Sequence, residues 1–104
     1  MSDASPNIQS RHPLVTVVVP VRNEAGNVAP LVGEIEAALV PLGAFEVVYV
    51  DDGSTDETPK VLADLRAERP WLRQIRHERS CGQSAAGRTG VRAARAPVVA
   101  TIDG

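Results

Sequence analysis

Five residues between positions 51 and 56 can do chemistry together: Asp51, Asp52, Ser54, Thr55 and Asp56, with Gly53 among them. Adjacent carboxylates repel each other unless a cation or hydrogen-bond donors face them. A carboxylate can also accept hydrogen bonds from a nucleobase N–H or from ribose hydroxyls. The plainer interpretation is a tight turn followed by a helix that Asp56 helps to begin. The segment alone leaves both interpretations open.

Two other segments have polar groups in a pattern that suggests a site. Arg22, Asn23 and Glu24 directly follow an apolar run that Pro20 stops. Residues 82–90 combine small residues with Arg88, but they lack the Gly-Lys-Ser/Thr ending of a P-loop and the glycines of a dinucleotide motif. A helix N-terminus with a nearby arginine can bind an anion, and the same small residues equally suit close helix–sheet packing. We interpret His77 and Cys81 as structural or incidental.

Composition limits the class of protein. The chain has 104 residues, enough for one small domain, with 43% hydrophobic and only 3% aromatic residues. A single cysteine excludes an internal disulfide framework. Scarce aromatic rings argue against a single-stranded nucleic acid platform. We expect residues 1–13 to be a disordered leader, residues 14–104 to be the folded part, and the location to be cytoplasmic, because neither a signal peptide nor a transmembrane run is apparent.

Charge is unevenly distributed along the chain. Residues 1–65 hold ten acidic and three basic residues, whereas residues 66–104 hold eight arginines and three acidic residues. A solvated surface explains this distribution simply. A more specific interpretation is that a cluster of acidic residues binds a cation and that a neighbouring group of basic residues binds an anion.

The elements that must position these groups alternate in type. Apolar, β-branched runs predict strands at 14–19, 45–50, 72–76 and 97–102. Periodic segments predict helices at 28–39, 58–69 and 84–94, with Pro30 in a first turn and Thr58 as an N-cap. This βαβαβαβ order predicts a Rossmann-like, three-layer α/β fold with a parallel sheet. Ligands bind beyond the carboxyl ends of such strands, which is where the polar segments fall.

Four motifs together resemble those of family-2 glycosyltransferases, in particular the dolichol-phosphate mannose synthase and bacterial polyprenyl-phosphate glycosyltransferase group. They are residues 17–24, 50–56, 82–90 and 101–104. The resemblance implies the nucleotide-binding half of a GT-A fold, with strand order 3-2-1-4. It also implies metal-assisted, inverting transfer of a sugar from a UDP- or GDP-linked donor to an acceptor such as a polyprenyl phosphate.

The resemblance also implies roles for individual residues. Asp51 would meet the base with Asp52 beside it, and Asp103 would hold the ribose and a Mg²⁺ or Mn²⁺ ion as the first carboxylate of a D-x-D motif. The full set of nucleotide-sugar-binding residues implied in this way is Pro20, Arg22, Glu24, Asp51, Asp52, Gln83, Ser84 and Asp103. No catalytic residue is assignable. Ser80 departs from the asparagine common in the family.

The family's second aspartate and acceptor site are absent after Gly104. We therefore expect an N-terminal fragment of a longer enzyme that acts at the cytoplasmic face of a membrane. The fragment should bind nucleotide without turnover and should self-associate through its fourth strand. The alternatives are a receiver-like phosphoacceptor signalling domain and another nucleotide-binding module. A receiver would have its acidic pair after the first strand, whereas here the pair follows the second.

Overall fold

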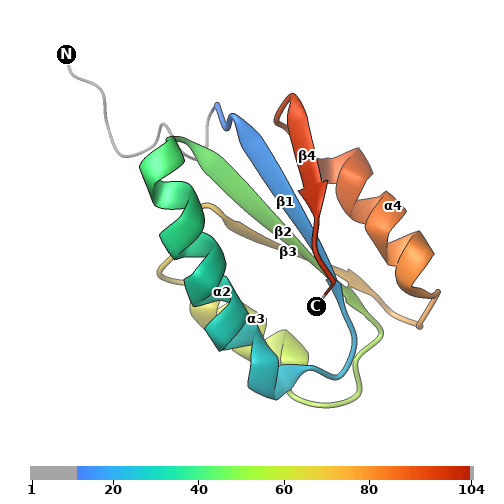
Figure 1. Ribbon diagram of the computed structural model, residues 1–104. Helices are drawn as coiled ribbons and strands as arrows, with labels where there is room; N and C mark the ends of the chain where they lie inside the picture. The colour runs from blue at the N-terminus through green and yellow to red at the C-terminus, as the bar shows by residue number, and fades with distance from the viewer. Residues whose placement is uncertain (1–11, 104) are drawn as a thin grey trace.

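The computed structural model describes residues 12–103 and shows one parallel sheet between two helical layers (Figure 1). Its strands are β1 (Val15–Val21), β2 (Phe45–Asp52), β3 (Leu72–His77) and β4 (Val98–Thr101), in the spatial order β3-β2-β1-β4. The helices are α2 (Ala25–Leu39), α3 (Thr58–Arg66) and α4 (Gln83–Ala93), with a short 3₁₀ helix, η1 (Val40–Leu42). The predicted α/β class, parallel sheet and strand order are confirmed.

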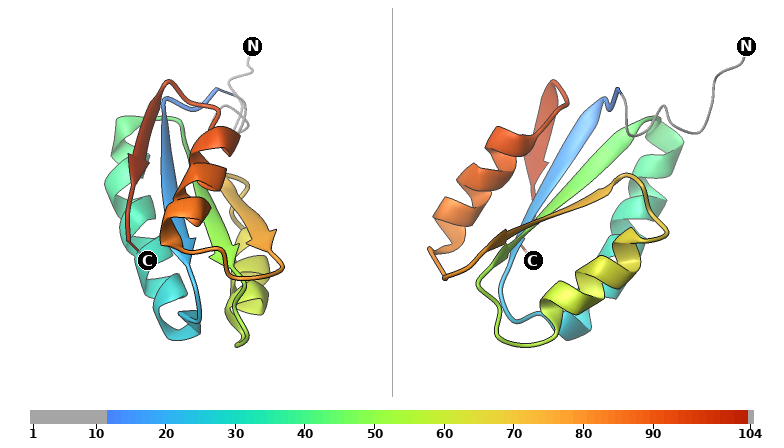
Figure 2. Two further views of the ribbon diagram at one scale, coloured as in Figure 1. Left: turned by 90° about the vertical axis from the view of Figure 1, so that its right-hand side faces the viewer. Right: turned by 180° about the vertical axis from the view of Figure 1, so that it is seen from behind.

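The sheet is buried on both faces because its central strands are apolar at nearly every position. Val17 and Val19 of β1 face α2 and α3, where they join the larger core. Val48 and Val50 of β2 face α4 with Ala86. Two further views show α2 and α3 on one side of the sheet and α4 on the other (Figure 2). Alternation along each strand therefore decides which helical layer a side chain meets.

Two details at the helix starts differ from the sequence predictions. Helix α2 begins at Ala25, three residues early, so Pro30 lies inside the helix and beyond its first turn. Helix α3 begins at Thr58 itself, so the prediction of Thr58 as N-cap was wrong. Its hydroxyl instead accepts a hydrogen bond from the Glu24 N–H at 3.0 Å and donates to Asp56. Tertiary contact between the two loops thus determines where both helices begin.

A buried carboxylate holds the connection between α4 and β4 against the sheet. Glu46 is 2% exposed and accepts hydrogen bonds from the Thr16 hydroxyl (2.7 Å), the Arg73 guanidinium (3.0 Å) and the Arg95 N–H (2.7 Å). Burial by itself raises the pKa of Glu46, but these donors outweigh it and hold the pKa below its ordinary value. The network fixes where β4 begins.

Strand β4 forms one edge of the sheet and is exposed at all four positions. Val98 is 56% and Val99 38% exposed, although β4 pairs in parallel register with β1. Of the predicted leader, residues 1–11 fall outside the described range, while His12 is exposed and Pro13 is buried. Among the described residues, no helix is long and apolar enough to cross a membrane.

Helix α4 approaches the sheet closely at Gly90. A Cβ at this position would lie 2.3 Å from Val18 Cγ1 and 3.2 Å from Val50 Cγ2, and both valines are fully buried. We expect Gly90→Ala to lower the free energy of unfolding by about 1–3 kcal/mol, because the packed valines must shift. The measurement is urea unfolding followed by circular dichroism.

Gly87 provides the matched control on the same helix. A Cβ there would meet nothing within 4 Å. Gly87→Ala should therefore raise the free energy of unfolding by about 0.5–1 kcal/mol through helix propensity alone. Equal effects of the two substitutions would contradict the close packing of α4 at Gly90.

Candidate functional site

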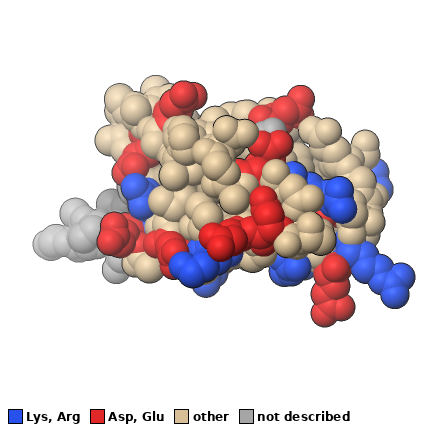
Figure 3. Space-filling view, turned by 90° about the horizontal axis from the view of Figure 1, so that it is seen from below, with Lys and Arg blue, Asp and Glu red and all other residues tan. Residues whose placement is uncertain are grey.

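The carboxyl ends of β1, β2 and β3 surround a hollow of about 280 Å³. Its wall comes from the loop after β1, the end of β2 and the loop that leads from β3 into α4. The lining residues are Pro20, Val21, Arg22, Glu24, Asp52, Ser80, Gly82 and Gln83. Viewed from this edge, acidic side chains extend across the face with lysine and arginine side chains beside them (Figure 3). Five of the eight residues expected from the sequence therefore share one hollow.

Asp52 is the most heavily bonded group of the hollow. Its Oδ1 accepts a hydrogen bond from the Cys81 N–H (2.8 Å) and contacts His77 Nδ1 (2.8 Å), and its Oδ2 accepts from the Gly82 N–H (2.9 Å) and the Ser80 hydroxyl (3.0 Å). Burial by itself raises the pKa of Asp52, but these donors outweigh it and lower the pKa to about 2. One carboxylate thus shapes the loop that closes the hollow.

This lowered pKa predicts acid sensitivity. A carboxylate that titrates lower in the folded than in the unfolded chain contributes stability above its unfolded pKa and loses it as the pH falls through its folded pKa. For Asp52 the loss should extend from about pH 4, near its ordinary pKa of 3.8, down to about pH 2. Urea unfolding across this range should show a steeper fall in wild type than in Asp52→Asn. Parallel curves would contradict the prediction.

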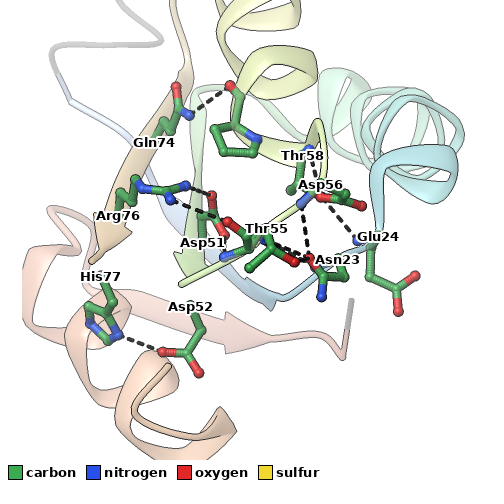
Figure 4. A network of polar contacts seen from close by, with 12 residues as sticks. Asn23, Glu24, Asp51, Asp52, Thr55, Asp56, Thr58, Gln74, Arg76 and His77 are labelled. Carbon is green, nitrogen blue, oxygen red and sulfur yellow. Dashed lines mark hydrogen bonds and ion pairs between the residues drawn. The ribbon is translucent and has the colours of Figure 1, made fainter. Parts of the chain in front are cut away.

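Asp51 points to the opposite side of β2 from Asp52 (Figure 4). Its carboxylate is fully buried, with Oδ1 accepting from the Ser54 N–H (3.0 Å) and Oδ2 from Arg76 (2.8 Å). Arg76 also donates to the Ser54 carbonyl at 3.2 Å. Asp51 is not part of the hollow's lining. Alternation along the strand separates the neighbouring carboxylates, so Asp51 holds the turn while Asp52 faces the hollow.

Asn23 joins the loops that follow β1 and β2 (Figure 4). It has a φ of 55°, and its side-chain oxygen accepts hydrogen bonds from the N–H groups of Thr55 (2.8 Å) and Asp56 (3.3 Å). The Asn23 N–H donates to the Ser54 hydroxyl at 2.8 Å. Asparagine tolerates the left-handed region better than most residues. These contacts set the position of neighbouring Arg22 and Glu24 in the hollow.

The remaining predicted residues lie around the start of α4. Gln83 lines the hollow, and its Nε2 donates to Asp103 Oδ1 at 2.7 Å, which places exposed Asp103 at the rim. Ser84 lies elsewhere, in a shallow second depression formed with residues of α4 and Thr101. The structure therefore brings Glu24, Asp52, Gln83 and Asp103 to one edge, and it places Asp51 behind that edge and Ser84 beside it.

Several residues of this arrangement were missed by sequence reasoning. Ser80 lines the hollow directly, whereas the sequence indicated only a loop there, and Gly82, the first residue of the segment 82–90, lines it as well. His77 and Cys81, interpreted as structural or incidental, both contact Asp52. The orientation of Asp52 could have been predicted, because Asp52 lies at an even position along β2, like Val48 and Val50, which face α4. The partners of His77 had no such signal because they lie on other elements.

In the part of the chain that the structure describes, two sets of residues could hold a metal ion. Asp103 offers an exposed carboxylate with hard oxygen donors, which suits Mg²⁺ or Mn²⁺ when substrate phosphates supply the remaining ligands. Its one hydrogen bond within the described residues, from Gln83, occupies Oδ1. The second set is Asp52, His77 and Cys81, whose ligand atoms lie within 4.8 Å of one another.

Comparison with known proteins gives consistent matches. Residues 16–104 match the model for glycosyl transferase family 2. The dodecaprenyl-phosphate galacturonate synthase of Rhizobium johnstonii is 40% identical over 95 residues, covering 86% of this chain and 27% of that protein. The undecaprenyl-phosphate 4-deoxy-4-formamido-L-arabinose transferase of Pseudomonas aeruginosa is 41% identical over 93 residues, with the same coverage. The chain thus spans about a quarter of these relatives.

Solved structures show the same half-fold. The mannosyltransferase PcManGT of Pyrobaculum calidifontis, in complex with GDP-Man and Mn²⁺, superposes with a TM-score of 0.80 at 31% identity, covering 91% of this chain and 28% of that one. TarS of S. aureus, in complex with UDP-GlcNAc, superposes with a TM-score of 0.75 at 26% identity, covering 86% and 26%. The sheet described above is therefore the GT-A arrangement.

Proposed function

This chain belongs to glycosyl transferase family 2, and from that premise we propose that the hollow at the carboxyl edge binds the nucleotide diphosphate of a nucleotide-sugar donor. The observation that carries the proposal is the convergence of three loops, remote in sequence, on one polar hollow. The proposed acceptor class is a polyprenyl phosphate, because curated relatives at 40% and 41% identity carry such acceptors in their names.

The contacts favour different roles for the residues of the proposed site. Asp52, ionised and facing the hollow, is the better placed of the two aspartates to accept a hydrogen bond from a base, and Asp51 acts behind it by holding the turn. Arg22 is exposed in the lining and provides a cation for the diphosphate. Pro20, Glu24 and Gln83 complete the wall, and Ser84 would contact only a ligand that extends over α4.

The chemistry requires neutralisation of a leaving diphosphate. When bound, a Mg²⁺ or Mn²⁺ ion would supply positive charge there, and Asp103 is the residue of this chain that would hold it. Gln83 fixes the Asp103 carboxylate at the rim through its 2.7 Å hydrogen bond. A phosphate acceptor is already anionic, which reduces the need for a general base. We assign none, and the proposed transfer is an inverting displacement.

Calorimetry with UDP and with GDP, each with and without Mn²⁺, tests the proposal. We expect binding of one of them that Mn²⁺ strengthens. Arg22→Ala should weaken binding about tenfold, which corresponds to about 1.4 kcal/mol, because it removes a cation from the lining. Arg92→Ala is the matched control, since Arg92 is also an exposed arginine but lies in the second depression. No binding of either nucleotide, or equal losses in both variants, would overturn the proposal.

We propose that these 104 residues bind nucleotide but transfer no sugar, because the chain covers 27% of its curated relatives. The proposed place of action is the cytoplasmic side of a membrane, where a polyprenyl phosphate is accessible to a nucleotide sugar. Sugar transfer by the chain alone, detected with a radiolabelled donor, would contradict this view.

We also propose self-association through β4. Within residues 12–103, β4 is an edge strand with exposed valines, and such an edge favours pairing with a second copy. Light scattering at high concentration should show a dimer or larger species, and Val99→Lys should shift it towards monomer. Leu42→Lys, at an exposed site on η1, should not. A monomeric wild type would exclude this association.

The two alternatives from the sequence are replaced by the family assignment. A receiver-like domain and a plain dinucleotide-binding module both share the parallel sheet, but neither accounts for a family match over residues 16–104. Labelling with acetyl phosphate should accordingly fail.

A further inference from the structure

We propose that Asp52, His77 and Cys81 form a binding site for a thiophilic divalent cation of the zinc class. Each residue offers one ligand atom, and the three atoms lie within 4.8 Å of one another. They come from the end of β2, the end of β3 and the loop before α4. Carboxylate, imidazole and thiolate groups are all zinc ligands, and three protein ligands leave a fourth position open.

The hydrogen bonds of His77 leave one ring nitrogen for a cation. Its Nε2 lies 2.9 Å from the Thr89 hydroxyl oxygen, and that hydroxyl donates to the Ala85 carbonyl at 3.1 Å. With its hydrogen directed to Ala85, the Thr89 oxygen can only accept, which places a hydrogen on His77 Nε2. Without an ion, a hydrogen on His77 Nδ1 joins this nitrogen to the Asp52 carboxylate oxygen 2.8 Å away. A zinc-class ion would take the place of that hydrogen between the two ligand atoms.

Thr89 therefore takes the position of a supporting group in a metal site. Histidines that bind metal usually donate their other N–H to a nearby acceptor, which fixes the ring orientation. Asp52 is 4% exposed and fixed by backbone N–H groups from Cys81 and Gly82. Two of the three ligands are thus held in place before any ion binds.

Cys81 supplies the third ligand with little rearrangement. Bonds of about 2.0 Å to nitrogen or oxygen and about 2.3 Å to one sulfur place the ligand atoms of a tetrahedral ion about 3.3–3.5 Å apart. The present separations run from 2.8 Å, between Asp52 and His77, to at most 4.8 Å. Cys81 is exposed, and within residues 12–103 its thiol donates a single hydrogen bond, to the Arg79 carbonyl at 3.4 Å. Turning this side chain, with loss of the thiol proton, completes the set.

Ligand softness separates this site from the one proposed at Asp103. Thiolate and imidazole favour zinc-class ions, whereas carboxylate and phosphate oxygens favour Mg²⁺ and Mn²⁺. Asp52 belongs both to this site and to the lining of the proposed nucleotide site, but the inference rests only on the separations of the three ligand atoms and not on nucleotide binding. It gives Cys81, the single cysteine of the chain, a definite function.

Cobalt(II) titration of the chain without nucleotide tests the proposal. Because the sequence contains one cysteine, a thiolate-to-cobalt charge-transfer band in the near ultraviolet must come from Cys81. We expect such a band to saturate at one Co²⁺ per chain and to disappear when Zn²⁺ is added, but not when Mg²⁺ is added. Cys81→Ser should abolish the band, and His77→Gln should weaken Co²⁺ binding at least about tenfold.

Matched controls use the other histidine and a neighbouring carboxylate. His12→Gln and Glu78→Gln alter exposed residues outside the three-ligand set and should leave the titration unchanged. Circular dichroism checks that each variant is folded, and the exposed Cys81 makes Cys81→Ser the safest variant structurally. Absence of the band at millimolar Co²⁺, saturation at one Co²⁺ per two chains, or an unweakened titration in folded His77→Gln would each overturn the proposal. A failure of nucleotide binding would leave it intact.

Discussion

Gly53→Ala should destabilise the chain by about 3 kcal/mol and remove nucleotide binding at the proposed site. Gly53 has a φ of +74°, and a Cβ there would lie 2.5 Å from the Ser80 nitrogen and 2.8 Å from the Arg79 carbonyl carbon. Both atoms are backbone, so no side-chain rotation relieves the contact. The loop that lines the hollow must move, and the strain of the left-handed conformation adds to the loss. Urea unfolding and calorimetry with UDP or GDP measure the two effects.

Gly82→Ala separates the contact from the backbone strain. Gly82 also has a positive φ, +99°, but a Cβ there would meet nothing within 4 Å. We expect this variant to lose only about 1–2 kcal/mol, the cost of a φ of 99° with a ψ of 157°, a combination that is essentially confined to glycine. If both variants lose the same free energy of unfolding, the close approach of the loop to Gly53 does not contribute to the loss.

Asp52→Asn should lower the free energy of unfolding by about 3 kcal/mol, because it removes a buried charge that four donors face. The amide group that replaces the carboxylate would direct its own hydrogens at one pair of those donors. The loop before α4 would loosen, and nucleotide binding at the proposed site should fall with it. Urea unfolding at pH 7, together with calorimetry, measures both losses.

Asp103→Asn distinguishes stability from binding. Asp103 is exposed and accepts one hydrogen bond, from Gln83, so its substitution should change the free energy of unfolding by no more than about 0.5 kcal/mol. It should instead remove the strengthening of nucleotide binding by Mn²⁺. If Asp52→Asn is as stable as Asp103→Asn, the four contacts of Asp52 contribute nothing.

Much of the fold could be predicted from the sequence because burial on both faces leaves a continuous signal. The run from Val15 to Val19 and the run from Phe45 to Val50 indicated central strands of a parallel sheet, and the polar Arg73 and Arg76 indicated an edge strand. The helix starts were less predictable. Helix α2 begins early because Thr58 and Asp56, more than thirty residues away, bond the N–H groups of Glu24 and Ala25.

The sequence alone determined that Glu24, the Asp51–Asp52 pair and Asp103 would come to one edge of a parallel sheet, because each of them lies at or just after the end of a strand. Only the tertiary structure decided how each of them faces that edge. Asp51 forms an ion pair with Arg76 on one face of the sheet, and Asp52 contacts His77 and the Cys81 N–H on the other face. Asp103 accepts a hydrogen bond from Gln83. The position of a buried strand follows from its local apolar pattern, and its parallel orientation follows from the alternation of strands and helices. The partner of a polar side chain depends instead on which remote loop packs beside it.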